Sequence, residues 1–421
     1  MKRIILVAVM IGSLFVNQSF AAKPDTQVDA LIRKLVEKGV LTDSEATQIK
    51  DEIVSDEKVI REDNMKKDIP QWVQDMKLQG DFRLRHEWSK RNDSSDQYRS
   101  RGRIRYRLGI ETKINDTTKV ALGLASNGGN SRSPNQTFTD TFAKSAINLD
   151  YAFAQWSPRV DGSIVLTGGK MKISFWEPSD LLWDTDLTPE GGAANLRMKI
   201  NDNLKVFTNL GAFVLLESAA DQTDPFSYVL QPGIELKLGE KSDLKTVFTY
   251  YGFSHGANKS VLSNRSSPTT NTVVGGKYSY KYDAFSGGAE IGFNDPFGEN
   301  FPVYIPRIGL IGQYIHNPDA DDEGSGWIAG SYIGNSKVSG KGQWKATMTY
   351  RSLGRDAWLD VLPDSDFYGG ATDVRGYEGI LELGLTKNVI LALDYYRAER
   401  LSSVTTKAPE SVLQTDLNFK F

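Results

Sequence analysis

The chain has 421 residues, with 50 Lys and Arg against 53 Asp and Glu, a formal net charge of −3 at pH 7 and no cysteine. This composition excludes a disulfide scaffold, a Cys-ligated metal site and a cysteine nucleophile, and the balanced charge argues against a nucleic-acid partner. The mean hydropathy is −0.39 and the longest apolar run is residues 4–16, which excludes a bundle of membrane-spanning helices but not a barrel in which every second residue faces lipid.

The first 22 residues have the features of a signal peptide. Lys2 and Arg3 precede the apolar run, which is too short to span a bilayer, and Ser19 and Ala21 are small residues at the −3 and −1 positions. We therefore predict residues 1–22 as a signal peptide that is cleaved after export. A buried N-terminal helix is the alternative.

Residues 23–70 show helical periodicity. Gly39 can end a first helix, and the segment from Thr42 to Glu45 resembles a capping box that opens a second. Because the segment is highly charged, we predict a helical hairpin or short coiled coil, with a charged linker as the alternative. The apolar residues at helical spacing in the first helix are Val28, Leu31, Ile32, Leu35 and Val36.

From Lys77 to Phe421 the period changes to two, as expected for β-strands. In residues 342–351, for example, Trp344 and Met348 alternate with Lys345 and Arg351. We predict sixteen strands, which begin near residues 77, 98, 117, 147, 161, 192, 204, 227, 243, 277, 302, 326, 342, 373, 388 and 411.

The connections between these strands alternate in length. Short turns such as 115–116 and 201–203 follow the even strands, whereas long polar loops such as 126–146 and 353–372 follow the odd ones. A soluble β-sandwich also alternates, but this pattern of connections is typical of an outer-membrane barrel. An even strand count places both termini, and the helical segment, in the periplasm; the connection 334–342 is longer than the rule predicts.

The chain ends in Phe421, preceded by alternating Phe419, Leu417 and Leu413. This ending resembles the C-terminal signal of Gram-negative outer-membrane proteins, which the barrel-assembly machinery reads. The signal peptide, the helical LIRKLVEKGVLTDSEA and the loop sequence LLWDTDLTPEGG together resemble the putative porin family of 16-stranded trimers.

This resemblance implies an all-β, 16-stranded antiparallel transmembrane β-barrel over residues 77–421, located in the outer membrane. It implies a homotrimer in contact with outer-membrane lipid and lipopolysaccharide, a passage for small hydrophilic solutes and no cofactor. Phosphate-selective porins also combine a helical prelude, sixteen strands and an arginine-lined pore, and form a second resemblance.

Five arginines lie at alternate positions of the second predicted strand, so a regular strand presents them on one face. Such charges are prohibitive in a dry core and costly against lipid, and the opposite face carries Ile104 and Ile110. We therefore expect this arginine ladder to line a water-filled lumen, with only its last three members inside as the alternative. It comprises Arg99, Arg101, Arg103, Arg105 and Arg107, and Arg83 and Arg85 of the first strand extend it.

The third long loop, residues 174–191, is acidic. In the family that the chain resembles, this loop folds into the barrel and narrows it, which implies that its carboxylates oppose the arginine ladder; an ordinary surface loop is the alternative. The loop carboxylates named as site residues are Asp184, Asp186 and Glu190, beside Glu177 and Asp180. Lys170 and Lys172, which alternate with apolar residues, are further lumen candidates.

These features favour a passive diffusion channel with an arginine-lined constriction. A channel selective for phosphate or another anion and a structural barrel that links envelope layers are alternatives. An enzyme is disfavoured, because His86, His255 and His316 are scattered and no nucleophile and base occur together. For the same reason we expect no metal site.

Overall fold

The computed structural model describes residues 27–53, 69–91, 97–126, 129–139, 141–217, 224–262, 269–298, 304–402 and 408–421. The predicted signal peptide lies outside these residues. The chain divides into two units, Met1–Gln74 and Asp75–Phe421.

The first unit is helical where it is described. It contains α1 (Gln27–Glu37), a helical stretch over residues 43–53 and α3 (Gln71–Gln74). The capping box is present: Thr42 N donates to Glu45 Oε2 over 2.8 Å, and Glu45 N donates to Thr42 Oγ1 over 3.3 Å. No helix in the described residues is long and apolar enough to cross a membrane.

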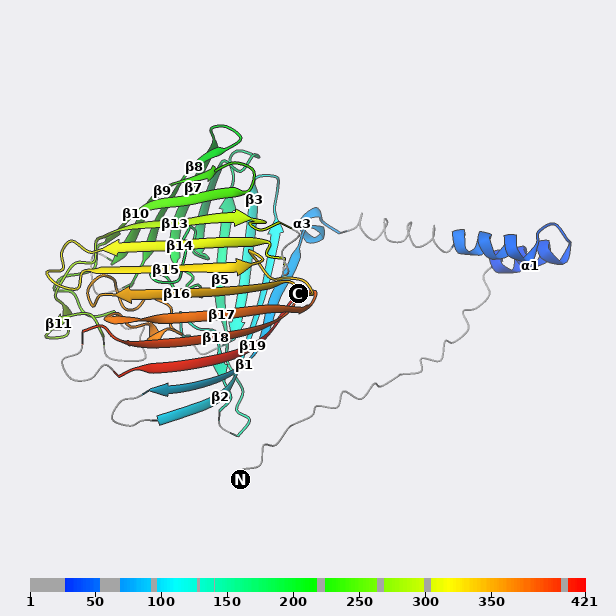
Figure 1. The fold of residues 1–421 in the computed structure, drawn as a ribbon. Coiled ribbons are helices and arrows are strands. Elements are labelled where there is room, and N and C mark those ends of the chain that lie inside the picture. Colours follow the sequence, from blue (N-terminus) through cyan, green and yellow to red (C-terminus); the bar gives the residue numbers. More distant parts are fainter. Residues whose placement is uncertain are drawn as a thin grey trace, which may run out of the picture. The chain divides into compact units, whose positions relative to one another are not determined.

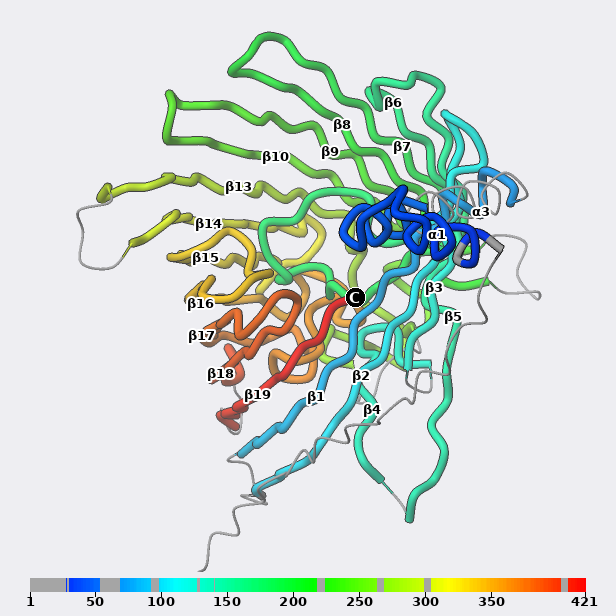
Figure 2. Tube along the Cα trace, turned by 90° about the vertical axis from the view of Figure 1, so that its right-hand side faces the viewer, coloured from blue at the N-terminus to red at the C-terminus, as the bar shows by residue number. Residues whose placement is uncertain are grey.

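The second unit is a closed antiparallel β-barrel of sixteen strands, which confirms the predicted fold class (Figure 1). Figure 2 shows the strands following one another around the wall. They are β1 (Lys77–Arg91), β2 (Gln97–Lys113), β3 (Thr118–Ser126), β5 (Ile147–Trp156), β6 (Ile164–Lys170), β7 (Glu190–Lys199), β8 (Leu204–Val214), β9 (Phe226–Lys237), β10 (Ser242–Phe253), β13 (Ala284–Asn294), β14 (Arg307–His316), β15 (Ser325–Gly334), β16 (Trp344–Leu353), β17 (Val374–Thr386), β18 (Val389–Arg400) and β19 (Glu410–Lys420).

Three shorter strands lie in the connections. β4 (Gln136–Thr137) pairs with β2 at Arg103 and Ile104, beyond the end of the β2–β3 ladder. β11 (Val273–Val274) and β12 (Lys277–Tyr278) form a small hairpin in the connection between β10 and β13.

The barrel closes where β1 pairs with β19, in a register that runs from Asp81 opposite Lys420 to Arg91 opposite Glu410. Beyond this register, Gly80 and Phe421 exchange two backbone hydrogen bonds of 2.8 and 3.1 Å. A Cβ at position 80 would collide with the backbone oxygen of Arg107, so only glycine allows the first, second and last strands to approach this closely.

Two predicted strand starts are wrong. The segment beginning at 277 alternates tyrosines with polar residues, but β13 starts at Ala284, and β14 starts at Arg307 rather than near 302. Tyr278 and Tyr282 are 1% and 0% exposed in the cluster that the inner loops form. The alternation of tyrosines with polar residues in this segment therefore reflects burial within a folded loop and does not indicate a strand of the barrel wall.

Apolar side chains cover much of the outer face. Leu84, Tyr106, Leu122 and Leu393 are exposed there, and Leu84 and Tyr106 alternate with the arginines of β1 and β2. Burial is instead found inside, where loop 171–189, loop 354–373 and the described parts of the connection 254–283 pack together around Leu182 and Trp358, both 0% exposed.

Candidate functional site

The arginine ladder and the inner residues of β1 face each other in strict register. Asp81 pairs with Arg107, Arg83 with Arg105, Arg85 with Arg103, Glu87 with Arg101, and Ser89 with Arg99. Because paired residues of neighbouring strands share a face, the carboxylates of β1 lie among the guanidinium groups of β2. The ladder is therefore one half of a mixed row of charges.

Two carboxylates of β1 each hold two ladder arginines. Asp81 lies 2.8 Å from Arg105 and 2.7 Å from Arg107. Glu87 forms ion pairs with Arg101 and, over 2.9 Å, with Arg103. Because each carboxylate lies between two arginines, the like-charged guanidinium groups can lie close together. The pairing matters because these charges are largely desolvated: the exposed fraction of Glu87 is 4%.

The two arginines of β1 reach the last strand. Arg85 binds Asp416 through two hydrogen bonds of 2.7 and 2.8 Å, and its Nη1 lies 2.7 Å from Asp366 of loop 354–373. Arg83 lies 3.2 Å from Asp416 and donates to Asn418 over 2.9 Å. Burial favours the protonated carboxyl group, but the attraction of Arg85 outweighs it and holds the pKa of Asp366 below its ordinary value.

Exposure varies along the ladder. Arg99 is exposed, Arg101 and Arg107 are partly exposed, and Arg103 and Arg105 are buried. The guanidinium groups in the middle of β2, those of Arg103 and Arg105, are therefore the most desolvated of the ladder.

Loop 171–189 leaves the wall at the end of β6 and contacts strands on distant parts of the barrel. Its Asp186 accepts a hydrogen bond of 3.0 Å from Arg107 of β2. Asp180 forms an ion pair of 2.7 Å with Arg351 of β16. Glu177 accepts hydrogen bonds from Tyr251 of β10 and Gln313 of β14. These strands are spread around the barrel, so the loop crosses its interior.

The three loop carboxylates singled out from the sequence have different surroundings. Asp186 meets the arginine ladder, whereas Asp184 is 3% exposed and accepts a hydrogen bond of 2.9 Å from the backbone N of Ser365. Burial, together with the charge of Asp186, raises the pKa of Asp184 to about 7. Glu190 forms an ion pair of 2.9 Å with Lys170, across the β6–β7 ladder.

Lys172 lies apart from that pair. Its Nζ is 5.0 Å from the centre of the Tyr151 ring, and it lines a cavity of about 400 Å³ together with Asp81, Arg105 and Arg107. Lys172 therefore lines the same cavity as Arg105 and Arg107, the last two residues of the arginine ladder.

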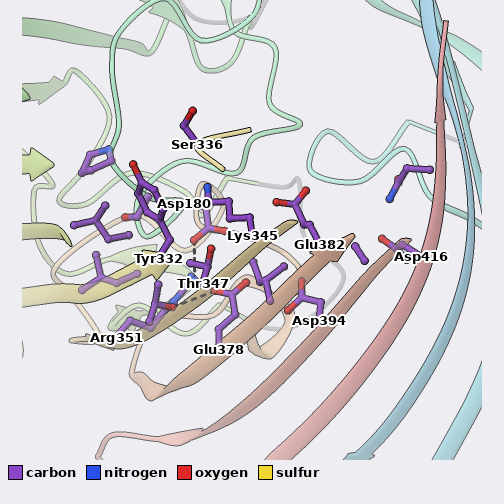
Figure 3. Close-up of a pocket in the computed structure, with 18 of the residues that line it drawn as sticks. Asp180, Tyr332, Ser336, Lys345, Thr347, Arg351, Glu378, Glu382, Asp394 and Asp416 are labelled. Carbon is purple, nitrogen blue, oxygen red and sulfur yellow. Dashed lines mark hydrogen bonds and ion pairs between the residues drawn. The ribbon is translucent and has the colours of Figure 1, made fainter. Parts of the chain in front are cut away.

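A second cavity, of about 620 Å³, also borders β1 and β19, since Asn418 lines both cavities, and is shown in Figure 3. Arg351 forms ion pairs there with Asp180 and, over 2.7 Å, with Glu378 of β17. Arg83 and Arg85 belong to the same lining, so the ladder borders both cavities. The other acidic residues of the lining are Glu290, Glu382, Asp394 and Asp416.

The inner loops interlock above these cavities. Trp358 Nε1 donates to the backbone oxygen of Leu182 over 2.7 Å, and the backbone N of Asp184 donates to Leu362 O over 2.7 Å. Arg132, which is buried, donates to backbone oxygens of loop 354–373, including Pro363 O over 3.1 Å. Loop 171–189 is therefore held in place by its neighbours.

Apart from Asp186 and Asp180, the sequence analysis did not single out the residues of the ion-pair network. Asp81, Glu87, Asp416, Asp366 and Arg351 carry the ion pairs described above. The strand residues among them could have been found by asking which charges share the inner face, since Asp416 alternates with outward apolar residues of the last strand. Within the described part of the chain, no group of three or more His, Asp or Glu side chains could hold a metal ion.

Comparison with known proteins finds porins, both among family models and among solved structures. A family model described as "Putative porin" matches residues 89–286 and 303–421. A high-pH structure of Pseudomonas putida OprB matches with a TM-score of 0.51 and 10% identity, covering 83% of this chain and 95% of that one. A triple mutant of Rhodopseudomonas blastica porin matches with a TM-score of 0.43 and 11% identity, covering 82% of this chain and 100% of that one. No curated protein matches.

Proposed function

The chain belongs to the putative porin family and is thus an outer-membrane channel protein rather than an enzyme, and we propose that small hydrophilic solutes and ions diffuse passively through the water-filled interior of its barrel. The fold, which OprB shares, supplies the wall of such a passage. The apolar outer face, with Leu84 and Leu122 among its exposed residues, suits contact with lipid.

The observation that carries this proposal is the course of loop 171–189. It contacts β2 through Asp186, β16 through Asp180, and β10 and β14 through Glu177. A loop that contacts four separated strands from inside must narrow the passage, and Arg107 is the residue of the arginine ladder that it contacts. We propose that this contact marks the constriction.

In this proposal the arginine ladder, Arg83 and Arg85 line the passage together with Lys170, Lys172, Asp184, Asp186 and Glu190. Paired charges of both signs in a narrow, low-dielectric passage create strong local fields that orient dipolar solutes and filter ions. The ladder arginines are matched by Asp81 and Glu87, so they supply polarity and local field more than a large excess of positive charge.

The family resemblance further supports a homotrimer that contacts outer-membrane lipid and lipopolysaccharide. It also supports recognition of Phe421 by the barrel-assembly machinery and removal of residues 1–22 on export. A large species that persists on an unheated SDS gel and collapses on boiling is the expected sign of the trimer.

Purified mature protein in planar lipid bilayers tests the function. We expect discrete conductance steps, and their absence at any protein concentration that inserts would overturn the channel. The Arg107→Gln variant tests the constriction, because its reversal potential in a salt gradient should move toward cation selectivity. Arg99→Gln, at the exposed end of the ladder, is the matched control and should move it less.

A further inference from the structure

The connection between β15 and β16, turn 335–343, is long for its rim of the barrel. It has nine residues, whereas the turn between β17 and β18 on the same rim has two. Both chain ends of the barrel lie at this rim, since β1 begins and β19 ends there. Short turns face the periplasm in outer-membrane barrels, so the long turn is at the periplasmic mouth.

Turn 335–343 is folded and held in place. Gln343 Oε1 accepts hydrogen bonds from the backbone N of Ser339 over 2.8 Å and of Gly340 over 2.9 Å. Asn388 N donates to Ser339 O over 3.0 Å, which ties the turn to its neighbour. Val338 at its centre is 2% exposed. A buried apolar side chain in a periplasmic turn means that the turn packs onto the protein.

The turn reaches across the barrel interior. Ser336 lines the cavity of about 620 Å³ and is labelled in Figure 3, where it lies on a different segment from Lys345 and Thr347 of β16. Lys337 lines the cavity of about 400 Å³. This smaller cavity is otherwise formed by β1, β2, β3, β5 and β19 with the start of loop 171–189, and β19 is separated from β16 by β17 and β18. Lys337 can share a lining with these strands only if the turn folds inward past β17 and β18.

Three lysines from distant parts of the sequence line the smaller cavity, of about 400 Å³. They are Lys172 at the start of loop 171–189, Lys337 of the turn and Lys420 at the end of β19. Among the described residues, no carboxylate forms an ion pair with any of the three, whereas Arg105 and Arg107 are held by Asp81. An ammonium group has three donors and a compact charge.

The charge of this lining is positive. Five cationic residues line it, against two acidic ones, Asp81 and Asp150, and the C-terminal Phe421. The ammonium groups of the three lysines are the part of this charge that no ion pair satisfies, which favours a small ligand with several negative oxygens.

We propose that Lys172, Lys337 and Lys420 form a binding site for small dianionic oxyanions at the periplasmic end of the passage, with turn 335–343 as the inward segment that completes it. As a site within the conduction path, it rests on the proposed channel function. Oxyanions that pass the constriction at Arg107 are held there before release, so the site favours their passage over that of chloride.

Sulfate is the probe, because it stays dianionic from pH 5 to pH 8. In planar bilayers with chloride as the main anion, added sulfate should block the current of the wild-type channel in a saturable way. Lys337→Gln should raise the half-blocking concentration roughly tenfold, as expected for the loss of one charge-assisted contact. Lys341→Gln, on the same turn but lining neither cavity, is the matched control and should behave like the wild type.

Calorimetric titration of the detergent-solubilised protein with sulfate separates the two proposals. Sulfate binding that Lys337→Gln weakens and Lys341→Gln does not, in a protein that fails to conduct, supports the site and overturns the channel. Conductance with no sulfate block, or with equal block in both variants, overturns the site and leaves the channel standing.

Discussion

Arg107 of β2 donates a hydrogen bond of 3.0 Å to Asp186 of loop 171–189, while its Nε lies 2.7 Å from Asp81 of β1. One guanidinium group thus joins the barrel wall to the loop that crosses the interior. Since the Arg107 side chain remains about one-third exposed, this contact borders the solvent-filled part of the barrel, and in the proposed channel its charges act on passing ions.

Asp186→Asn removes one negative charge beside that space. We expect the channel to shift toward anions, with the permeability ratio of chloride to potassium rising roughly fivefold, because one unit charge about 8 Å away in water changes the energy of each ion by about 0.5 kcal/mol, with opposite signs for the two ions. The reversal potential in a potassium chloride gradient measures this ratio. Glu190→Gln, whose carboxylate lies against Lys170, is the comparison; an equal shift in both variants would contradict a special role for Asp186.

Trp358→Ala should loosen loop 171–189. The indole is 0% exposed, packs against Trp183 and Tyr251, and donates to Leu182 O over 2.7 Å. Its truncation leaves a large cavity and an unpaired carbonyl, at a cost of about 3–5 kcal/mol to stability. We expect a higher and noisier single-channel conductance because the loop can leave its position. A quiet channel with the wild-type conductance would show that other contacts hold the loop.

Arg85→Met should destabilise the barrel, because it leaves Asp416 and Asp366 without the buried cation that bridges them. Breaking such a pair from one side costs about 3–5 kcal/mol. Heat-modifiable migration on SDS gels, scored as the temperature at which half the protein unfolds, measures the effect.

Arg91→Met controls for the Arg85 experiment, because Arg91 pairs with Glu410 across the same two strands but its side chain is 42% exposed. We expect a change of less than about 1 kcal/mol from this variant, as for other surface ion pairs. Equal losses of stability in the two variants would indicate that the buried ion pairs of Arg85 with Asp416 and Asp366 do not stabilise the closed barrel.

The pH dependence of stability should reflect Glu177. Burial raises the pKa of this carboxyl group to about 7 from its ordinary value near 4.5. Between these two values the folded protein keeps a proton that the unfolded chain has lost, so the free energy of unfolding falls as the pH rises from about 4.5 to about 7. Glu177→Gln cannot ionise and should lessen this fall. A wild-type midpoint temperature that rises over the same interval would contradict the assignment.

Several features of the fold could be predicted from local sequence. The two-residue alternation gave sixteen strands, and fourteen of the predicted starts lie within about three residues of those observed, because one face of each wall strand is apolar and the other polar. Alternation failed at Tyr278 and Tyr282, since burial inside a packed loop selects the same residue types as a strand.

By itself, the sequence determined the kind of molecule: a barrel with an apolar outer face, a row of arginines on one face of a strand and an acidic third loop. Only the tertiary structure decided which charges meet. Arg85 and Asp416 are 331 residues apart, and Lys172, Lys337 and Lys420 come from three separate connections or strand ends. The local period sets the face on which a side chain lies, whereas barrel closure and the course of the loops, which depend on packing over the whole chain, set its partner.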